Sequence, residues 1–259
     1  MSEGEGDSSE NPGDAGSEET EDLTPICDEY DVYLCIGQSN MAGRGYLLDS
    51  DLSETVSGVY LLDGSDAPVA ATHPFNQYST IRKELSVQRM SPSYAFSKKM
   101  YEASGGRKIL LVVNARGGTG IDAWASTATA TNYYSEAVRR TKQACRYGKL
   151  KGIMWHQGET DAGPVASTTY MARLSNLVTA LRNDLGDVPV VVGEIADAES
   201  NSVYFNPMIS KVSDNITSSA CALSDGCTTL SDNIHFDRDS QLVMGERFAE
   251  AMLTLQSAQ

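Results

Sequence analysis

The chain has 259 residues, of which 41% are hydrophobic and 21% charged, so it can bury a sizeable core in one or two domains. Its net charge of −15 argues against nucleic acids and anionic membrane surfaces as partners, because both attract basic faces. No apolar run is long enough to span a membrane, and no secretory signal peptide is recognisable in the sequence as given.

The acidic residues are concentrated at the N-terminus. Residues 1–22 hold nine of the 35 acidic residues and no Lys or Arg. Their Gly, Ser, Glu and Asp side chains offer almost nothing to bury. We therefore predict that residues 1–25 are a disordered acidic tail, or a linker to a neighbouring module. Residues 26–259 are predicted to form a single domain.

Strands and helices alternate along the rest of the chain. Continuous apolar runs predict strands over residues 32–36, 59–62, 109–113, 152–155 and 188–195. Helical spacing and glycine stops predict helices over residues 92–103, 133–145, 171–185 and 242–255. This alternation implies a mostly parallel sheet with helices on both faces. In such folds the ligand lies beyond the carboxyl ends of the strands, so site residues should follow strands directly.

The first candidate motif, Gly-Gln-Ser-Asn-Met-Ala-Gly at residues 37–43, directly follows the first strand. A Ser between a strand and a helix start can project its hydroxyl from the sheet edge. Its own N–H then lies at a helix N-terminus, which stabilises negative charge. Ser39 is therefore a candidate nucleophile, and a helix-capping serine in a turn is the alternative.

A second motif, Asn-Ala-Arg-Gly-Gly-Thr-Gly at residues 114–120, follows the strand predicted at 109–113. Its glycines allow close backbone approach and leave N–H groups free, so the N–H of Gly118 is a candidate oxyanion donor. A plain tight turn is the alternative. A phosphate cradle is disfavoured, because no Lys-Ser/Thr pair follows the glycines.

The third motif, Trp-His-Gln-Gly-Glu-Thr-Asp at residues 155–161, follows the strand predicted at 152–155. Gln157 can donate its amide N–H to an oxyanion, and Glu159 can orient a histidine. His156 is interpreted as a hydrogen-bonded structural imidazole. With three histidines in the chain and no Cys-x-x-Cys pair, neither a metal site nor a cofactor is predicted.

In the fourth motif, Asp232 and His235 are three residues apart in a loop before the last predicted helix. In a bent loop the Asp carboxylate can hold one imidazole nitrogen, which leaves the other to deprotonate a serine. The alternative is a surface turn with a capping Asp. Taken together, the four motifs supply the nucleophile, base, acid and oxyanion donors that acyl transfer needs.

These four motifs, over about residues 31–240, resemble those of the SGNH hydrolases. They are most similar to carbohydrate esterase family 6 (acetylxylan esterases) and to sialate O-acetylesterase-like proteins. The resemblance implies a flavodoxin-like three-layer α/β/α fold and metal-free deacetylation of sugars, with acetylated xylan the best-known substrate class. It also suggests that the protein is secreted, as does the combination of an acidic tail and a polymeric substrate.

The resemblance also implies roles for individual residues. Ser39 is the implied nucleophile and His235 the implied base. The implied oxyanion donors are the N–H groups of Ser39 and Gly118 and the side chain of Gln157. Asp232 fits the superfamily's acid, while Glu159 lies in a motif of the narrower family and is an alternative or additional acid.

The substrate is left open between acetylated xylan and another acetylated sugar such as O-acetyl sialic acid. Specificity is expected from the loops at 44–58, 63–90 and 120–132. Candidate sugar contacts, each with ordinary packing as the alternative, are Tyr46, Tyr78, Trp124 and Tyr133. A carbohydrate-binding module without catalysis and a lipase-like or thioester hydrolase are the rival functions.

The cysteines predict little about function. Cys35 lies in an apolar run and is expected to be a small core residue. Cys27 and Cys145 are expected to be able to remain free. Cys221 and Cys227 are close enough in sequence to form a disulfide if the protein is exported.

Overall fold

The computed structural model describes residue 1 and residues 23–258, so most of the tail predicted at residues 1–25 lies outside the described residues. Seven strands form one sheet in the order β3-β2-β4-β1-β5-β6-β7. All neighbours pair in parallel except β2 and β3, which are antiparallel. The strands are β1 (Tyr30–Gly37), β2 (Val59–Leu62), β3 (Pro68–Ala70), β4 (Lys108–Val113), β5 (Gly148–His156), β6 (Val190–Gly193) and β7 (Ser219–Ala222).

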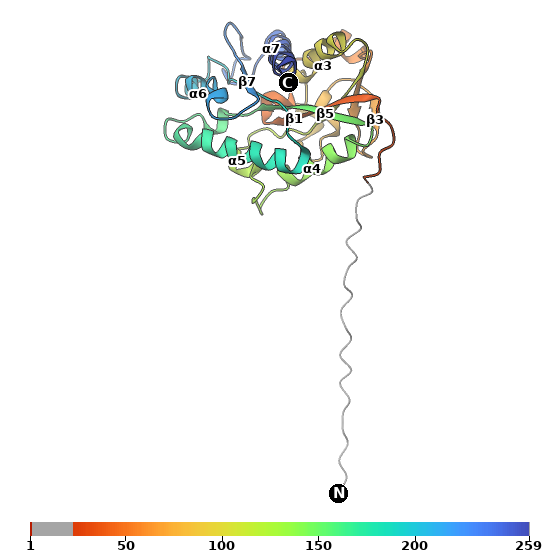
Figure 1. Ribbon diagram of the computed structural model, residues 1–259. Coiled ribbons are helices and arrows are strands. Elements are labelled where there is room, and N and C mark those ends of the chain that lie inside the picture. The colour runs from red at the N-terminus through yellow and green to blue at the C-terminus, as the bar shows by residue number, and fades with distance from the viewer. Residues whose placement is uncertain (2–22, 259) are drawn as a thin grey trace.

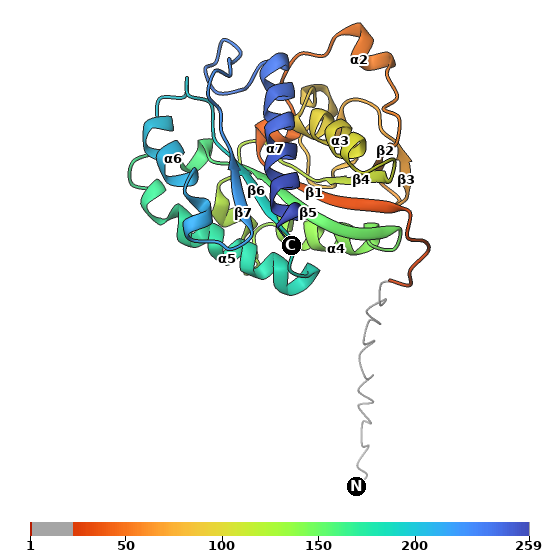
Figure 2. The ribbon, with the colours of Figure 1, turned by 45° about the horizontal axis from the view of Figure 1, so that its top comes forward.

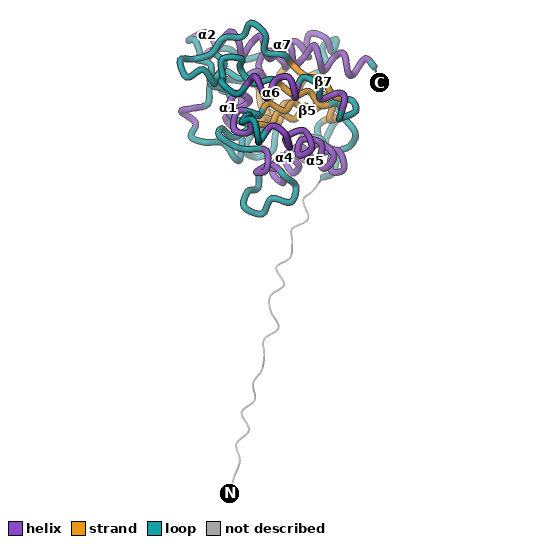
Figure 3. The backbone as a smooth tube through the Cα atoms, turned by 90° about the vertical axis from the view of Figure 1, so that its left-hand side faces the viewer, coloured by secondary structure: helices purple, strands orange, loops and turns teal. Residues whose placement is uncertain are grey.

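Helices cover both faces of this sheet, as the alternation of elements predicts (Figure 1). Helices α3 and α7 lie on one face, and α4 and α5 lie on the other (Figures 1 and 2). Figure 3 shows the strands enclosed between these two layers. The helices are α1 (Ser39–Ala42), α2 (Asp49–Ser53), α3 (Pro92–Ala103), α4 (Tyr133–Ala144), α5 (Ser167–Leu185), α6 (Ser202–Ile209) and α7 (Arg238–Ser257). The fold is thus the predicted three-layer α/β/α arrangement.

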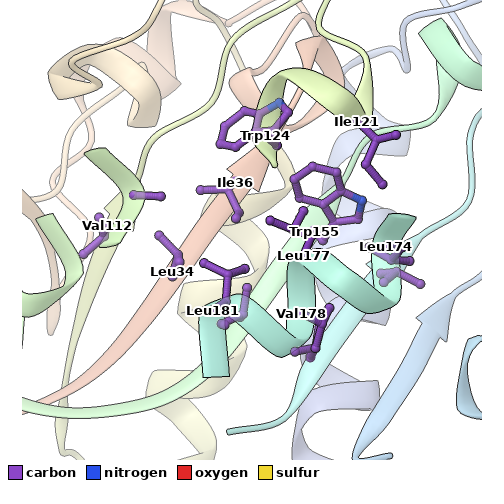
Figure 4. Packing of buried hydrophobic residues seen from close by; sticks show 14 of the residues in the cluster. Leu34, Ile36, Val112, Ile121, Trp124, Trp155, Leu174, Leu177, Val178 and Leu181 are labelled. Carbon is purple, nitrogen blue, oxygen red and sulfur yellow. The ribbon is translucent and has the colours of Figure 1, made fainter. Parts of the chain in front are cut away.

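Alternate residues of the strands build a separate core on each face. Leu34 and Ile36 of β1 pack with Trp155 of β5 against Leu174 and Leu181 of α5 (Figure 4). Because successive strand residues point to opposite faces, their neighbours enter the other core. There they meet apolar side chains of α3 and α7, among them Phe96, Met100, Phe248 and Met252. Continuous apolar runs were therefore a sound signal for buried strands.

The structure departs from the predicted elements where local sequence signals are weak. The last predicted strand, 188–195, is shorter in β6, and Pro189 precedes its first residue. The short strands β3 and β7 were not predicted, because β3 has only three residues and β7 is built from Ser, Ala and Cys. Helix α6 was also missed, since it is short and contains Pro207.

The cysteines are free thiols throughout the described part of the chain. Cys35 is fully buried, as predicted. Cys221 and Cys227 are not joined, which corrects the disulfide considered for them; the Cys227 thiol instead lies 3.6 Å from the Arg247 guanidinium. Within residues 23–258, no helix combines the length and apolar character that crossing a membrane requires.

Candidate active site

Three of the predicted motifs meet because they follow three adjacent strands. β1 lies between β4 and β5, and each is followed directly by one motif. The ends of β1 and β5 contact closely at Gly37, where a Cβ atom would lie 2.1 Å from the His156 carbonyl oxygen. Gly37 also has a φ of 140°, which favours glycine. The sheet therefore brings the Ser39 turn against the loops that follow β4 and β5.

Ser39, His235 and Asp232 form a continuous hydrogen-bonded relay. The Ser39 Oγ lies 2.9 Å from His235 Nε2. On the other side of the ring, His235 Nδ1 lies 2.6 Å from Asp232 Oδ2. Since the carboxylate accepts the Nδ1 proton, Nε2 is left to accept the proton of the Ser39 hydroxyl. The structure therefore joins the three residues that the first and fourth motifs supply.

The loop that carries His235 is shaped by Asp232. The second carboxylate oxygen of Asp232 accepts the backbone N–H groups of Ile234 and His235, each at 2.9 Å. The turn between them needs a left-handed residue, and Asn233 occupies it with a φ of 61°. Partial burial raises the pKa of Asp232, but these hydrogen bonds outweigh it and leave the pKa below its usual value. Asp232 is thus held ionised beside the imidazole.

Gln38 presents its amide nitrogen to Ser39. Its Nε2 lies 3.5 Å from Ser39 Oγ, and the side chain lines the cavity above the serine. The amide oxygen faces away, where it accepts hydrogen bonds from Gln157 Nε2 at 3.0 Å and from the Thr160 hydroxyl at 3.2 Å. These donors fix which end of the amide faces Ser39. No role for Gln38 is predicted from the sequence.

Gln157, the predicted oxyanion donor, contacts the side chain of Gln38 and not that of Ser39. Its Nε2 already faces three acceptors, Gln38 Oε1, the Thr119 carbonyl and Asp161 Oδ2, at 2.8 to 3.0 Å. Its carbonyl oxygen accepts the hydroxyl of Tyr170. The residue is almost completely buried and does not line the cavity. The structure thus does not bring the Gln157 amide to Ser39; the side-chain amide that lies beside Ser39 Oγ is that of Gln38.

Glu159, the alternative acid, lines the cavity but does not bond His235. Its Oε1 accepts a hydrogen bond from Asn40 Nδ2, and its Oε2 has no hydrogen-bond partner among the residues that the structure describes. Burial raises the pKa of Glu159 to about 7, although hydrogen bonds, including the one from Asn40, lower it. The structure therefore brings Asp232, and not Glu159, to the imidazole.

His156 is the structural imidazole that the sequence analysis expects. It is fully buried, and its Nε2 donates to the Glu194 carbonyl at 2.9 Å. Its ring stacks against Phe236, the residue after His235. Burial lowers the pKa of His156 to about 4, so the ring is neutral at physiological pH. It therefore packs against the residue that follows His235 and does not contact Ser39.

The cavity beside Ser39 has a volume of about 560 Å³ and contains two basic side chains. Gly118 lines it with a φ of 74°, as the glycine-rich motif predicts. Arg44 donates to the Gly43 and Val87 carbonyls, and burial, with Arg89 nearby, lowers its pKa. In the described residues neither Arg44 nor Lys83 forms an ion pair with a carboxylate. Neither residue belongs to the motifs that predict the site from the sequence.

The candidate sugar contacts differ in their accessibility. Trp124 is fully buried and packs edge-on against Trp155, which corrects its assignment as a sugar contact. Tyr133 packs against Trp124, and Tyr78 is packed against the other core. Tyr46 is 59% exposed, with Arg89 over one face of its ring. Tyr46 is therefore the candidate whose side chain is open to solvent.

The fold and this arrangement of side chains define an α/β/α protein of hydrolase type. Residues 29–254 match the family described as carbohydrate esterase, sialic acid-specific acetylesterase. The match spans most of the chain, so the protein belongs to this family of carbohydrate esterases.

Relatives of known structure share the fold. A probable carbohydrate esterase of Arabidopsis thaliana is 24% identical over 237 residues, covering 86% of this chain and 90% of that protein. A crystal structure of an Arabidopsis thaliana protein superposes with a TM-score of 0.75 at 24% identity, over 87% of this chain and 98% of that one. The crystal structure of NanS gives a TM-score of 0.67 at 17% identity, over 90% and 100% of the two chains.

A carbohydrate acetylesterase from Xanthomonas citri gives a TM-score of 0.64 at 18% identity. The match covers 88% of this chain but only 57% of the Xanthomonas protein. At these identities the structural likeness supports the fold, whereas the family match supports the enzyme class.

Proposed function

We propose that this protein is a serine esterase that releases acetate from an O-acetylated carbohydrate, with acetylated xylan as the first candidate substrate. The observation that carries the proposal is the relay from Asp232 through His235 to Ser39, with contacts of 2.6 and 2.9 Å at the wall of an open cavity. This is the geometry of an activated serine nucleophile.

In the first half of the reaction His235 Nε2 takes the Ser39 proton, and Ser39 Oγ attacks the acetyl carbonyl carbon. Negative charge then develops on the former carbonyl oxygen. The proposed donors to this oxyanion are the N–H groups of Ser39 and Gly118 and the Nε2 of Gln38. Collapse of the intermediate expels the sugar alkoxide, which takes the proton from His235, and leaves an acetyl group on Ser39.

In the second half, water replaces the sugar. His235 removes a proton from the water, which attacks the acetyl carbonyl of the acyl-enzyme. The same donors stabilise the second oxyanion, and acetate leaves as Ser39 recovers its proton from His235. Asp232 remains ionised throughout and stabilises the imidazolium that forms in each half.

The test is acetate release from acetylated xylan, with the wild type and Ser39→Ala compared at equal concentrations of folded protein. We expect release by the wild type and nearly none by the variant. Equal release by both would refute the mechanism. If a chromogenic acetate ester is cleaved but xylan is not, the chemistry stands and another acetylated sugar is the substrate. Inactivity on both esters would favour a carbohydrate-binding module without catalysis.

Arg44 and Lys83 favour a second candidate, an O-acetylated acidic sugar such as sialic acid. They present positive charge to the cavity and have no carboxylate partner within the described part of the chain, whose full sequence carries a net charge of −15. A sugar carboxylate bound there would supply that partner through charge-assisted hydrogen bonds.

This candidate is tested with O-acetyl sialic acid and a neutral acetylated xylo-oligosaccharide as competing substrates. Lys83→Met should lower the ratio of kcat/KM for the acidic over the neutral sugar by about tenfold, because one charge-assisted hydrogen bond is lost. An unchanged ratio would exclude Lys83 from recognition of a carboxylate and leave acetylated xylan as the first candidate substrate.

A further inference from the structure

The proposed mechanism leaves a half-buried acid in the cavity wall without a role. Glu159 bonds neither Ser39 nor His235, yet it lines the same cavity as both. Its one described side-chain partner is Asn40, the residue after the nucleophile. A buried carboxyl group costs folding free energy unless its hydrogen bonds offset that cost. Its contact with Asn40 therefore calls for an explanation.

Asn40 connects Glu159 to both sides of His235. Asn40 Nδ2 donates to the carbonyl oxygen of Ile234 at 3.1 Å. On the other side of the amide, Asn40 Oδ1 accepts the backbone N–H of Phe236 at 3.0 Å. These are the two residues that flank His235. One side-chain amide, itself fully buried, therefore spans the backbone that carries the proposed base.

Every donor and acceptor of the Asn40 side chain has a hydrogen-bond partner, and Glu159 is one of these partners. The amide group has two hydrogens, one for the Ile234 carbonyl and one for Glu159 Oε1. Its oxygen is shared by Phe236 N–H and Gln241 Nε2. Without Glu159, one buried N–H would lose its acceptor, and the amide would tilt or admit water to recover one. Either change would move the backbone on both sides of the imidazole.

We propose that Glu159 is a positioning residue that sets the place of His235 through Asn40, and that it is not the acid of the relay. This inference rests on the function proposed above, because it assigns Glu159 a part in the same reaction. Only an acceptor is required at Glu159 Oε1, so a neutral side chain with an oxygen at that place should serve.

The electrostatic difference between the two acids supports this division. Burial raises the pKa of Glu159 to about 7, and the nearby carboxylate of Glu199 raises it further. Asp232 is half-exposed, accepts three hydrogen bonds and keeps a pKa below its usual value. A group that is largely neutral near pH 6 supplies an acceptor, whereas an imidazolium needs the charge that Asp232 provides.

The test compares Glu159→Gln, which keeps an acceptor oxygen, with Glu159→Met, which keeps length but has none. The control is Glu194→Met, since Glu194 is a buried glutamate that accepts hydrogen bonds from Ser224 and not from Asn40. The readouts are the rate at which a sulfonyl fluoride labels Ser39, kcat and KM on a chromogenic acetate, and Tm. The labelling rate reports activation of the serine in folded protein, so loss of folded protein alone does not lower it.

We expect Glu159→Gln to label within about threefold of the wild type and Glu159→Met to label about 10- to 100-fold more slowly, with the loss in kcat rather than KM. Glu194→Met should lower Tm without this slowing. The inference is overturned if Glu159→Met labels at the wild-type rate, or if Glu159→Gln is as slow as Asp232→Asn. A wild type that is neither labelled at Ser39 nor active would instead refute the proposed function itself.

Discussion

Replacing Gln38 by Met tests which glutamine serves the oxyanion. The substitution keeps the length of the side chain but removes the N–H that lies 3.5 Å from Ser39 Oγ. When the substrate's oxygen occupies the cavity, that N–H would become a direct donor at hydrogen-bonding distance. Loss of one such donor costs about 10²- to 10³-fold in turnover, or about 3–4 kcal/mol of transition-state stabilisation. We expect a fall of this size in kcat with little change in KM.

The matched variant is Gln157→Met, because Gln157 is the donor that the sequence predicts. Its loss removes one hydrogen bond from Gln38 Oε1, while Thr160 still donates to that oxygen. It also removes the described partner of the Thr119 carbonyl and one acceptor of the buried Tyr170 hydroxyl, which keeps the backbone carbonyl of residue 157 as its other acceptor. We therefore expect Gln157→Met to lower the free energy of unfolding by about 2–4 kcal/mol and to reduce kcat of the folded fraction only about tenfold.

The assay is steady-state hydrolysis of a chromogenic acetate, normalised to folded protein, with urea unfolding of each variant. Gln38→Glu provides a further check, because it places a carboxylate oxygen where the oxyanion needs a donor, and it should be slower than Gln38→Met. The assignment is wrong if Gln38→Met stays within about threefold of the wild type. It is equally wrong if Gln157→Met, per folded molecule, loses more kcat than Gln38→Met.

Three further predictions follow from buried or paired charges. Asp232→Asn should lower kcat by about 10²- to 10⁴-fold, since the imidazole loses its counter-charge. Steady-state kinetics measures this loss, and circular dichroism should show that the variant remains folded. The pKa of Glu159 is about 7 in the folded chain, against an ordinary value of 4.5. Between these two pH values Glu159 is therefore mostly protonated in the folded chain but ionised in the unfolded chain. As pH rises from 4.5 to 7, the free energy of unfolding of the wild type should therefore fall by about 3 kcal/mol relative to that of Glu159→Gln. The prediction is refuted if urea unfolding shows the same pH dependence for the wild type and the variant. Arg140 is buried and donates to the carbonyls of Tyr78, Leu62 and Asp63, so Arg140→Met should cost about 3–5 kcal/mol by urea unfolding while kcat per folded molecule is unchanged.

Sequence patterns predicted the framework because they report burial along the backbone. The apolar run at 109–113 corresponds to β4, and the helix predicted at 92–103 coincides with α3. Pro92 lies in the first turn of α3, and Gly105 follows its end with a φ of 68°, so both boundaries have local causes. The short strands β3 and β7 carry no comparable signal. The three residues of β3 are too few to show a pattern and are held by antiparallel pairing with the preceding strand β2, while β7 is held by β6, which is distant in sequence.

For the site, the sequence predicted which loops meet but not which side chains face one another. Ser39, Asp232 and His235 follow from spacing and from the rule that ligands lie beyond strand ends. The roles of Gln38 and Gln157 depend on which of the two amides faces Ser39, and the packing of the neighbouring strands β1 and β5 determines this. Glu159 was placed beside a histidine by motif, whereas packing turns it toward Asn40.

The two glutamines explain how a flexible amide can act as a fixed donor. An amide side chain can rotate by half a turn and present either oxygen or nitrogen, and oxygen toward an oxyanion would repel it. Gln38 is prevented from doing so, because its oxygen accepts from the Gln157 amide and from the hydroxyl and N–H of Thr160. A half-turn would point the Gln38 N–H₂ at these donors and take away the acceptor that they share. Gln157 is held in turn by the Thr119 carbonyl and Asp161, so the orientation is set before substrate binds. Preorganised donors of this kind stabilise a transition state without reorganisation during the reaction.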